Sequence, residues 1–205
     1  MKKYLLSLIV IGMFSFSAQA VFRSEVFVGG SYGGQLAYRK SNVNYTMTNS
    51  GVPAGIFLGY KGSSGFYSGL EYTFIGMGFT DATAPSTHVD ITTSYHNASL
   101  KLGYEGSRVR FYLSYAPSNT LYFYRKASTQ TNTPDVLYGT SAVGAGIGFN
   151  MGTRWALDLA YFTDTFSTFD FGASKGQTVS GSSTFKNITN SNIMLKLVFK
   201  LSGMK

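Results

Sequence analysis

The chain has 205 residues, of which 44% are hydrophobic, 16% aromatic and only 13% charged, and its formal net charge is +8. This length allows one domain or at most two small ones. The absence of cysteine excludes disulfide scaffolds, thiolate metal sites, thiol nucleophiles and anchoring through a lipid-carrying cysteine. A mean hydropathy of +0.03 excludes a bundle of transmembrane helices.

The first twenty residues have the three parts of a secretory signal peptide. Lys2 and Lys3 give a positive start, an apolar run covers 4–16, and Ser17-Ala18-Gln19-Ala20 ends in a small-residue cleavage site. The apolar run is shorter than the roughly 20 residues that a membrane-spanning helix needs. We therefore expect residues 1–20 to be cleaved on export from a bacterial cell, and residues 21–205 to form one mature domain.

Apolar and polar residues alternate with a period of two after residue 20, and helical periodicity is nearly absent. The pattern predicts eight β-strands. Their approximate ranges are 24–34, 53–61, 65–78, 92–105, 108–124, 141–151, 154–166 and 188–201. In the last seven strands one face is almost entirely apolar, whereas the other face carries mainly glycine and charged residues. The first strand shows the weakest alternation.

The connections between these strands alternate strictly between short and long. The short ones are the turns at Gly62-Ser63-Ser64, Gly106-Ser107 and Gly152-Thr153, and the long ones cover 35–52, 79–91, 125–140 and 167–187. In an up-and-down sheet, this alternation places all tight turns at one end and all long loops at the other. Outer-membrane barrels have this layout, with periplasmic turns and extracellular loops. The sequence therefore predicts an all-β fold, an eight-stranded antiparallel up-and-down transmembrane β-barrel.

A soluble lipocalin-like barrel would show the same alternation with its apolar face inside. The small polar face favours the membrane barrel, because Gly144, Gly146 and Gly148 would leave room in a narrow lumen for larger neighbours. On a water-facing surface, these glycines would only weaken the strand.

Charged residues of both signs share the polar face and would meet in the lumen. They are Glu71, Lys101, Arg110, Asp158, Lys196 and Lys200. Because eight strands leave an interior just wide enough for side chains, we expect an ion network that fills the barrel. Each carboxylate should have a basic neighbour, because burying unpaired charge is costly. A channel with a charged constriction is the alternative.

Aromatic residues gather on the apolar face close to the tight turns. They are Tyr60, Phe66, Tyr104, Phe111, Phe149, Trp155 and Phe199. A belt of rings at one height is typical of a membrane–water interface. We therefore expect an aromatic girdle on the periplasmic side of the membrane.

The segments GIFLGY (55–60), SGLEYT (68–73), LKLGY (100–104) and VGAGIG (143–148) resemble the small OmpA/OmpX-type outer-membrane barrels, also called opacity-type surface proteins. The resemblance covers the mature chain. It implies a structural or surface protein of the bacterial outer membrane without a cofactor. Its expected partners are outer-membrane lipid and lipopolysaccharide, the barrel-assembly machinery and periplasmic chaperones. A host surface ligand is a candidate partner for the four long loops. The chain departs from the family's aromatic C-terminus, because residues 202–205 follow the last strand.

Basic residues begin two of the long loops at the outer rim. Arg39 and Lys40 begin the first loop, and Arg125 and Lys126 begin the third. Lipopolysaccharide carries phosphates at this height, so charge-assisted contacts are one interpretation. Ordinary hydrated loop charge is the other interpretation. An exported barrel meets no nucleic acid, so the positive net charge does not indicate nucleic-acid binding.

Only two histidines occur, His88 and His96. Ser94 and His96 share the outward face of their strand, an arrangement that would suit a lipid A-modifying enzyme. However, the order Ser-x-His is the reverse of that in the known lipid A deacylases, and only Asp90 is available as an orienting carboxylate. We therefore expect no enzyme, no catalytic residue and no metal. The predicted function is envelope integrity, to which the family resemblance alone adds adhesion or host interaction through the loops. A narrow channel is the first alternative and a lipid A-modifying enzyme the second.

Overall fold

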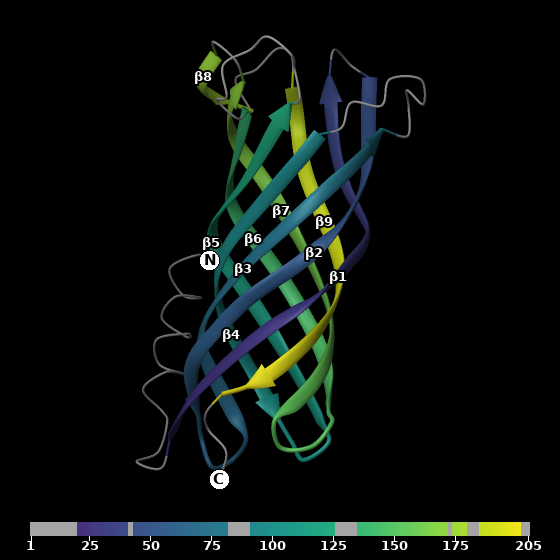
Figure 1. Cartoon of the computed structure of the whole chain (residues 1–205). Coiled ribbons are helices and arrows are strands. Elements are labelled where there is room, and N and C mark those ends of the chain that lie inside the picture. Colours follow the sequence, from purple (N-terminus) through teal and green to yellow (C-terminus); the bar gives the residue numbers. More distant parts are fainter. Residues whose placement is uncertain are drawn as a thin grey trace.

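Eight long antiparallel strands form a barrel (Figure 1). The computed structural model describes residues 20–40, 43–81, 91–125, 135–171, 174–179 and 185–201. The barrel strands are β1 (Val21–Lys40), β2 (Val43–Lys61), β3 (Phe66–Asp81), β4 (Ile91–Glu105), β5 (Val109–Arg125), β6 (Asp135–Asn150), β7 (Trp155–Phe171) and β9 (Phe185–Lys200). The short strand β8 (Ser174–Thr178) pairs with the end of β7.

The sheet closes on itself because β1 pairs with β9, β9 with β7, and β7 with β6. Every other barrel strand pairs with its sequence neighbours, which confirms the predicted up-and-down order. Closure gives the backbone N–H and C=O groups partners within the barrel wall. No helix among the described residues is long and apolar enough to cross a membrane.

The predicted long connection over 35–52 is wrong. Residues 35–40 belong to β1 and residues 43–52 to β2, and the ladder continues as far as the pair Lys40 and Val43. The strand signal is weak here because the alternation reverses: the outward positions are polar, as at Gln35 and Thr48, whereas Leu36 points inward. The first connection is therefore an extended hairpin instead of a long loop.

Strands also enter the last two predicted long connections. β6 begins at Asp135, six residues before its predicted start, and β7 continues to Phe171. β8 and the start of β9 occupy further parts of 167–187, so this region is largely an extension of the strands. The predicted signal peptide up to Gln19, the residues His88, Asp90 and Lys126, and the tail 202–205 lie outside the described residues.

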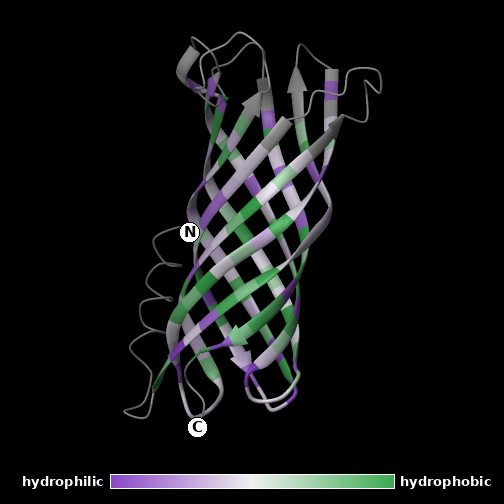
Figure 2. Ribbon diagram, viewed as in Figure 1, coloured by the Kyte–Doolittle hydropathy of each residue, from purple (hydrophilic) through white to green (hydrophobic). Residues whose placement is uncertain are grey.

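The barrel has an apolar exterior on its turn side. Leu70, Leu113 and Leu159 are among the outward-facing residues that are more than half exposed. Hydrophobic residues are frequent along this part of the strands (Figure 2). Apolar residues on the opposite, inward face of this part, including Phe57, Tyr67 and Tyr112, are buried. The predicted orientation of the apolar face toward the outside is therefore confirmed for the turn-side part of the barrel.

The long-loop side of the barrel reverses this arrangement. An apolar cluster fills its interior, formed by Leu36, Ile75, Met77, Leu121, Leu137, Phe166, Phe169, Val179 and Ile188. The outward positions there are polar, as at Thr163, Thr165 and Thr189. Water outside the wall drives apolar side chains inward, as in a soluble barrel. We call this set of nine residues the outer core, and we infer that it lies beyond the membrane.

Leu121→Ala in the outer core should destabilise the barrel more than Leu113→Ala on the lipid-facing side of the same strand. Leu121 is 0% exposed and Leu113 is 65% exposed. The first change loses transfer free energy and leaves a cavity, and it should cost about 2–5 kcal/mol. Lipid chains refill the space beside residue 113, so the second change loses only the transfer contribution. Urea-induced unfolding in lipid vesicles measures both. Equal losses would contradict the assignment of an outer core.

Candidate functional site in the barrel lumen

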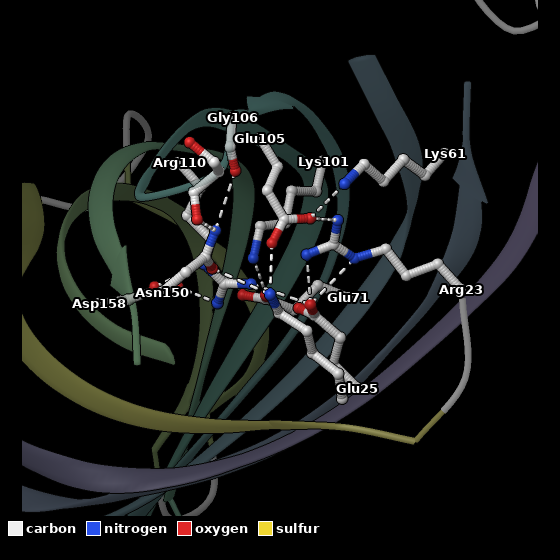
Figure 3. Close-up of polar contacts among 12 residues, drawn as sticks. Arg23, Glu25, Lys61, Glu71, Lys101, Glu105, Gly106, Arg110, Asn150 and Asp158 are labelled. Atoms are coloured by element: carbon white, nitrogen blue, oxygen red, sulfur yellow. Dashed lines mark hydrogen bonds and ion pairs between the residues drawn. The ribbon is translucent and has the colours of Figure 1, made fainter. Parts of the chain in front are cut away.

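The structure places all six predicted lumen residues inside the turn-side part of the barrel. Figure 3 labels four of them, Glu71, Lys101, Arg110 and Asp158. None of the six is more than 9% exposed. They come from β3, β4, β5, β7 and β9, and they point toward one another because they occupy the inward positions of a closed sheet.

Glu71 of β3 is bound by two lysines from different strands. Lys101 Nζ of β4 lies 2.7 Å from Glu71 Oε2, and Lys196 Nζ of β9 lies 2.8 Å from Glu71 Oε1. Both ammonium groups also lie over aromatic rings, Lys101 at 3.7 Å from the centroid of Tyr112 and Lys196 at 4.3 Å from that of Phe27. The two lysines therefore reach across the lumen to one carboxylate, and ring faces add cation–π attraction.

Arg110 of β5 forms the second centre. Its Nε donates to Asp158 Oδ1 at 2.7 Å and its Nη2 donates to Asp158 Oδ2 at 2.6 Å, a two-point contact with the carboxylate of β7. Its Nη1 also donates to Glu25 Oε1 of β1 at 2.9 Å. A Cβ at Gly148 would collide with Asp158 Oδ1, so the glycine opposite leaves the space that this pair occupies.

The network contains four further residues that the sequence analysis omitted. Arg23 contacts both Glu25 and Glu105, and Glu105 also accepts from Lys61 at 3.0 Å and from Lys200. These residues lie at or next to the predicted strand ends, where too few positions remain to show alternation. Inward parity could have found them, since Arg23 and Glu25 continue the inward positions of Phe27.

Each of these ten charged side chains has at least one partner of opposite charge. Lys61 is the most hydrated, with a side chain 30% exposed at the turn-side mouth. Mutual attraction and hydrogen bonds offset the cost of desolvating these ions. We call this set the ion network. The arrangement holds the strands together across the lumen and fills it with side chains.

A second polar layer lies between the ion network and the outer core. Tyr95 donates to Asp164 Oδ1 at 2.8 Å, and Asn190 Nδ2 donates to Asp164 Oδ2 at 3.1 Å. Asn97 Nδ2 donates to the Tyr95 hydroxyl at 2.7 Å, and Asn49 Nδ2 donates to Asn190 Oδ1 at 3.2 Å. Within the described part of the chain, Asp164 has no basic partner. We call these residues the amide layer. It was not predicted, because its contacts depend on the register of strands far apart in the sequence.

A cavity of about 30 Å³ separates the amide layer from the ion network. Tyr95 and Asn97 line it on one side, and Glu71 and Lys196 line it on the other. This volume is enough for a buried water molecule, and the lining offers several polar partners.

The seven predicted girdle residues all point outward on the turn side. Neighbouring rings pack edge to face or stack, with centroid distances of 5.3 Å for Phe66 and Tyr104, 5.5 Å for Tyr104 and Phe111, and 4.7 Å for Trp155 and Phe199. Phe22, which precedes the predicted first strand, adds a contact with Tyr60 at 5.8 Å.

Ser94 and His96 do come together on the outward face of β4. Ser94 Oγ lies 3.3 Å from His96 Nε2, and the hydroxyl of Tyr72 lies 2.6 Å from His96 Nδ1. Tyr72 therefore orients the imidazole, and Asp90, the carboxylate considered for this role, lies outside the described residues. Arg39 and Lys40 end β1, and Arg125 ends β5, so these predicted lipopolysaccharide contacts stand at strand ends on the long-loop side. Among the described residues, no cluster of His, Asp or Glu could hold a metal ion.

The comparisons with known proteins concern structure alone. No family model and no curated protein sequence matches the chain. The crystal structure of Neisserial surface protein A matches 88% of this chain and 97% of its own, with a TM-score of 0.53 and 14% identity. Ail, the attachment invasion locus protein of Yersinia pestis, matches 87% of this chain and 98% of its own, with a TM-score of 0.53 and 13% identity. A second Ail structure, in complex with the heparin analogue sucrose octasulfate, has a TM-score of 0.51.

These likenesses give the chain the fold of the small OmpA/OmpX-type outer-membrane barrels. The apolar wall and the closed backbone ladder require hydrocarbon around the turn-side part of the barrel. The protein is an integral barrel of the bacterial outer membrane.

Glu71→Gln should lower the free energy of unfolding by about 3–5 kcal/mol, because it leaves Lys101 and Lys196 as buried cations without a counter-charge. Glutamine keeps the shape of the side chain, so the loss reports charge. Denaturant unfolding in detergent micelles measures it. Arg154→Gln in an exposed turn is the control and should stay within about 0.5 kcal/mol of the wild type. A wild-type value for Glu71→Gln would refute a stabilising ion network.

Proposed function

We propose that the protein is a non-conducting, non-enzymatic barrel that strengthens the outer membrane and holds a rigid surface structure above it. The observation that carries this proposal is the filling of the lumen by three successive layers. The ion network, the amide layer and the outer core follow one another from the turn side to the long-loop side. Each layer is built from side chains of several strands, so each also ties the wall together.

The layered lumen argues against the alternative of a narrow channel. A permeating ion would have to displace the paired side chains around Glu71 and then pass the outer core, which offers it no polar group. Eight strands leave no second path beside these side chains.

The wild-type barrel should show no conductance steps in planar bilayers bathed in concentrated KCl. Insertion is verified independently by heat-modifiable gel migration of protein recovered from the same lipid. Steps whose ion selectivity changes in Glu71→Gln would establish a channel through the lumen and contradict this proposal.

The part beyond the membrane supports the surface role. β1 and β2 continue as an extended hairpin, and β7 continues into a ribbon with β8. Recognition residues are frequent on segments that a rigid scaffold presents. Basic residues lie at strand ends on this side, Arg39 and Lys40 at the end of β1 and Arg125 at the end of β5. The Ail complex with a heparin analogue supports a polyanionic surface ligand for this chain as well. Lipopolysaccharide phosphate is a second acceptor for the same charges.

We further propose that the barrel-assembly machinery and periplasmic chaperones deliver the chain, in keeping with its fold. The enzyme alternative has less support. Ser94 and His96 lie within hydrogen-bond reach, but no described carboxylate orients the imidazole. The strand backbone around Ser94 is committed to ladder pairing, so it offers no free N–H group to an oxyanion.

Cells that display the barrel should bind immobilised heparin, and the double change Arg39→Gln and Lys40→Gln should weaken this binding several-fold, because charge-assisted contacts to sulfate are lost. The matched control is Arg108→Gln with Arg154→Gln, which removes the same charge from the turn side. Equal binding by the two double variants would exclude a polyanion site at the outer end of β1.

A further inference from the structure

The side chain of His96 faces the lipid. Among Asp, Glu, Lys, Arg and His residues of the described strands within the apolar band, His96 of β4 is the one that points outward. Polar groups on the lipid-facing side of a barrel are unfavourable to a degree that depends on their depth. His96 lies outside the lumen, so the ion network does not account for its position or its hydrogen bonds.

The outer edge of the band is where His96 lies. It precedes the turn-side end of β4, Glu105, by nine residues. At about 3.4 Å rise per residue and a tilt of about 40°, this corresponds to a height of about 23 Å. The apolar band of an outer-membrane barrel is about 25 Å tall. His96 therefore stands at the level of the outer-leaflet headgroups.

The hydrogen bonds among Tyr72, His96 and Ser94 leave one of their hydrogen-bond donors unused. Tyr72, His96 and Ser94 form a chain with distances of 2.6 Å and 3.3 Å. A neutral imidazole has one N–H and one acceptor nitrogen. If Nδ1 carries the hydrogen, it donates to Tyr72, and the tyrosine hydroxyl hydrogen is free. If Nε2 carries it, Ser94 keeps the free hydroxyl hydrogen. In either tautomer, the trio can donate one hydrogen bond to an acceptor outside.

The surroundings of the trio leave room on one side. Phe74 and Tyr122 pack edge to face against His96, with centroid distances of 5.1 Å and 5.4 Å. Across the ladder, Ser94 pairs with Gly76, where a Cβ would meet only the Phe74 ring, and a Cβ at Gly78 would meet nothing within 4 Å. Ser94 itself is only 9% exposed, between His96 and the Tyr122 strand, so a headgroup reaches the trio from the side of Gly76 and Gly78, where the wall is bare backbone.

We propose that Tyr72, Ser94 and His96 form a binding site for a phosphate group of lipopolysaccharide in the outer leaflet. The site supplies a hydroxyl donor at headgroup height, and phosphate oxygen is a strong acceptor for it. The long-loop side of such a barrel faces the cell exterior, where this glycolipid forms the leaflet. The site lies outside the lumen, so it does not depend on whether the barrel conducts.

The two histidines of the chain allow a direct test with ¹⁵N-histidine NMR of the barrel in detergent micelles. Addition of purified lipopolysaccharide should shift the ring nitrogens of His96 and fix one tautomer. Phosphatidylglycerol at equal phosphate concentration should leave these signals unchanged. Equal shifts with both lipids would overturn the assignment to lipopolysaccharide, and no shift with either would overturn the site.

Variants test the hydroxyl groups. The double change Tyr72→Phe with Ser94→Ala removes both donors and should weaken lipopolysaccharide retention about tenfold in native mass spectrometry. Tyr161→Phe is the matched control, because Tyr161 is an outward-facing tyrosine of the opposite wall. Heat-modifiable gel migration verifies that each variant folds. Undiminished retention by a folded double variant would refute the proposal.

Discussion

A peptide group in hydrocarbon finds no hydrogen-bond partner outside its own chain, and the architecture of this barrel follows from that constraint. The ladder must close, and with eight strands it closes around a narrow interior. Inward side chains then have little access to water, so their charges must be paired with one another. The two lysines on Glu71 and the two-point contact of Arg110 with Asp158 are consequences of closure as much as contributors to stability.

The same barrel wall is surrounded by lipid in one part and by water in the other. On the turn side, lipid surrounds the apolar positions and ions occupy the lumen. On the long-loop side, water surrounds threonine and serine, and the outer core occupies the lumen. The amide layer, with Tyr95 and Asp164, lies where the two arrangements meet. It supplies hydrogen bonds to a level of the interior that is neither ionic nor apolar, and it keeps the strands in register there.

Alternation and connection length were enough to predict the closed barrel and to place six charged residues in its lumen. These two signals failed at strand ends, beyond the membrane, and for contacts between strands. Arg23 and Glu105 lie at strand ends, where too few positions remain to reveal a face. Residues 35–52 lie beyond the lipid, where the outward positions are polar and apolar side chains such as Leu36 point inward, the reverse of the pattern on which the prediction depends. The amide layer and the contact of Tyr72 with His96 depend on cross-strand register, which hydropathy does not encode.

The outer core also bears on the vertical position of the barrel. If the barrel slid toward the periplasm, Thr163, Thr165 and Thr189 would enter hydrocarbon, and the girdle around Trp155 would leave its interface. Both displacements are unfavourable. The close-packed outer core also resists a deformation of the barrel wall that would lower their cost. The depth of the barrel in the bilayer is therefore set at both ends, by the aromatic girdle on the turn side and by the water-facing polar surface around the outer core on the long-loop side.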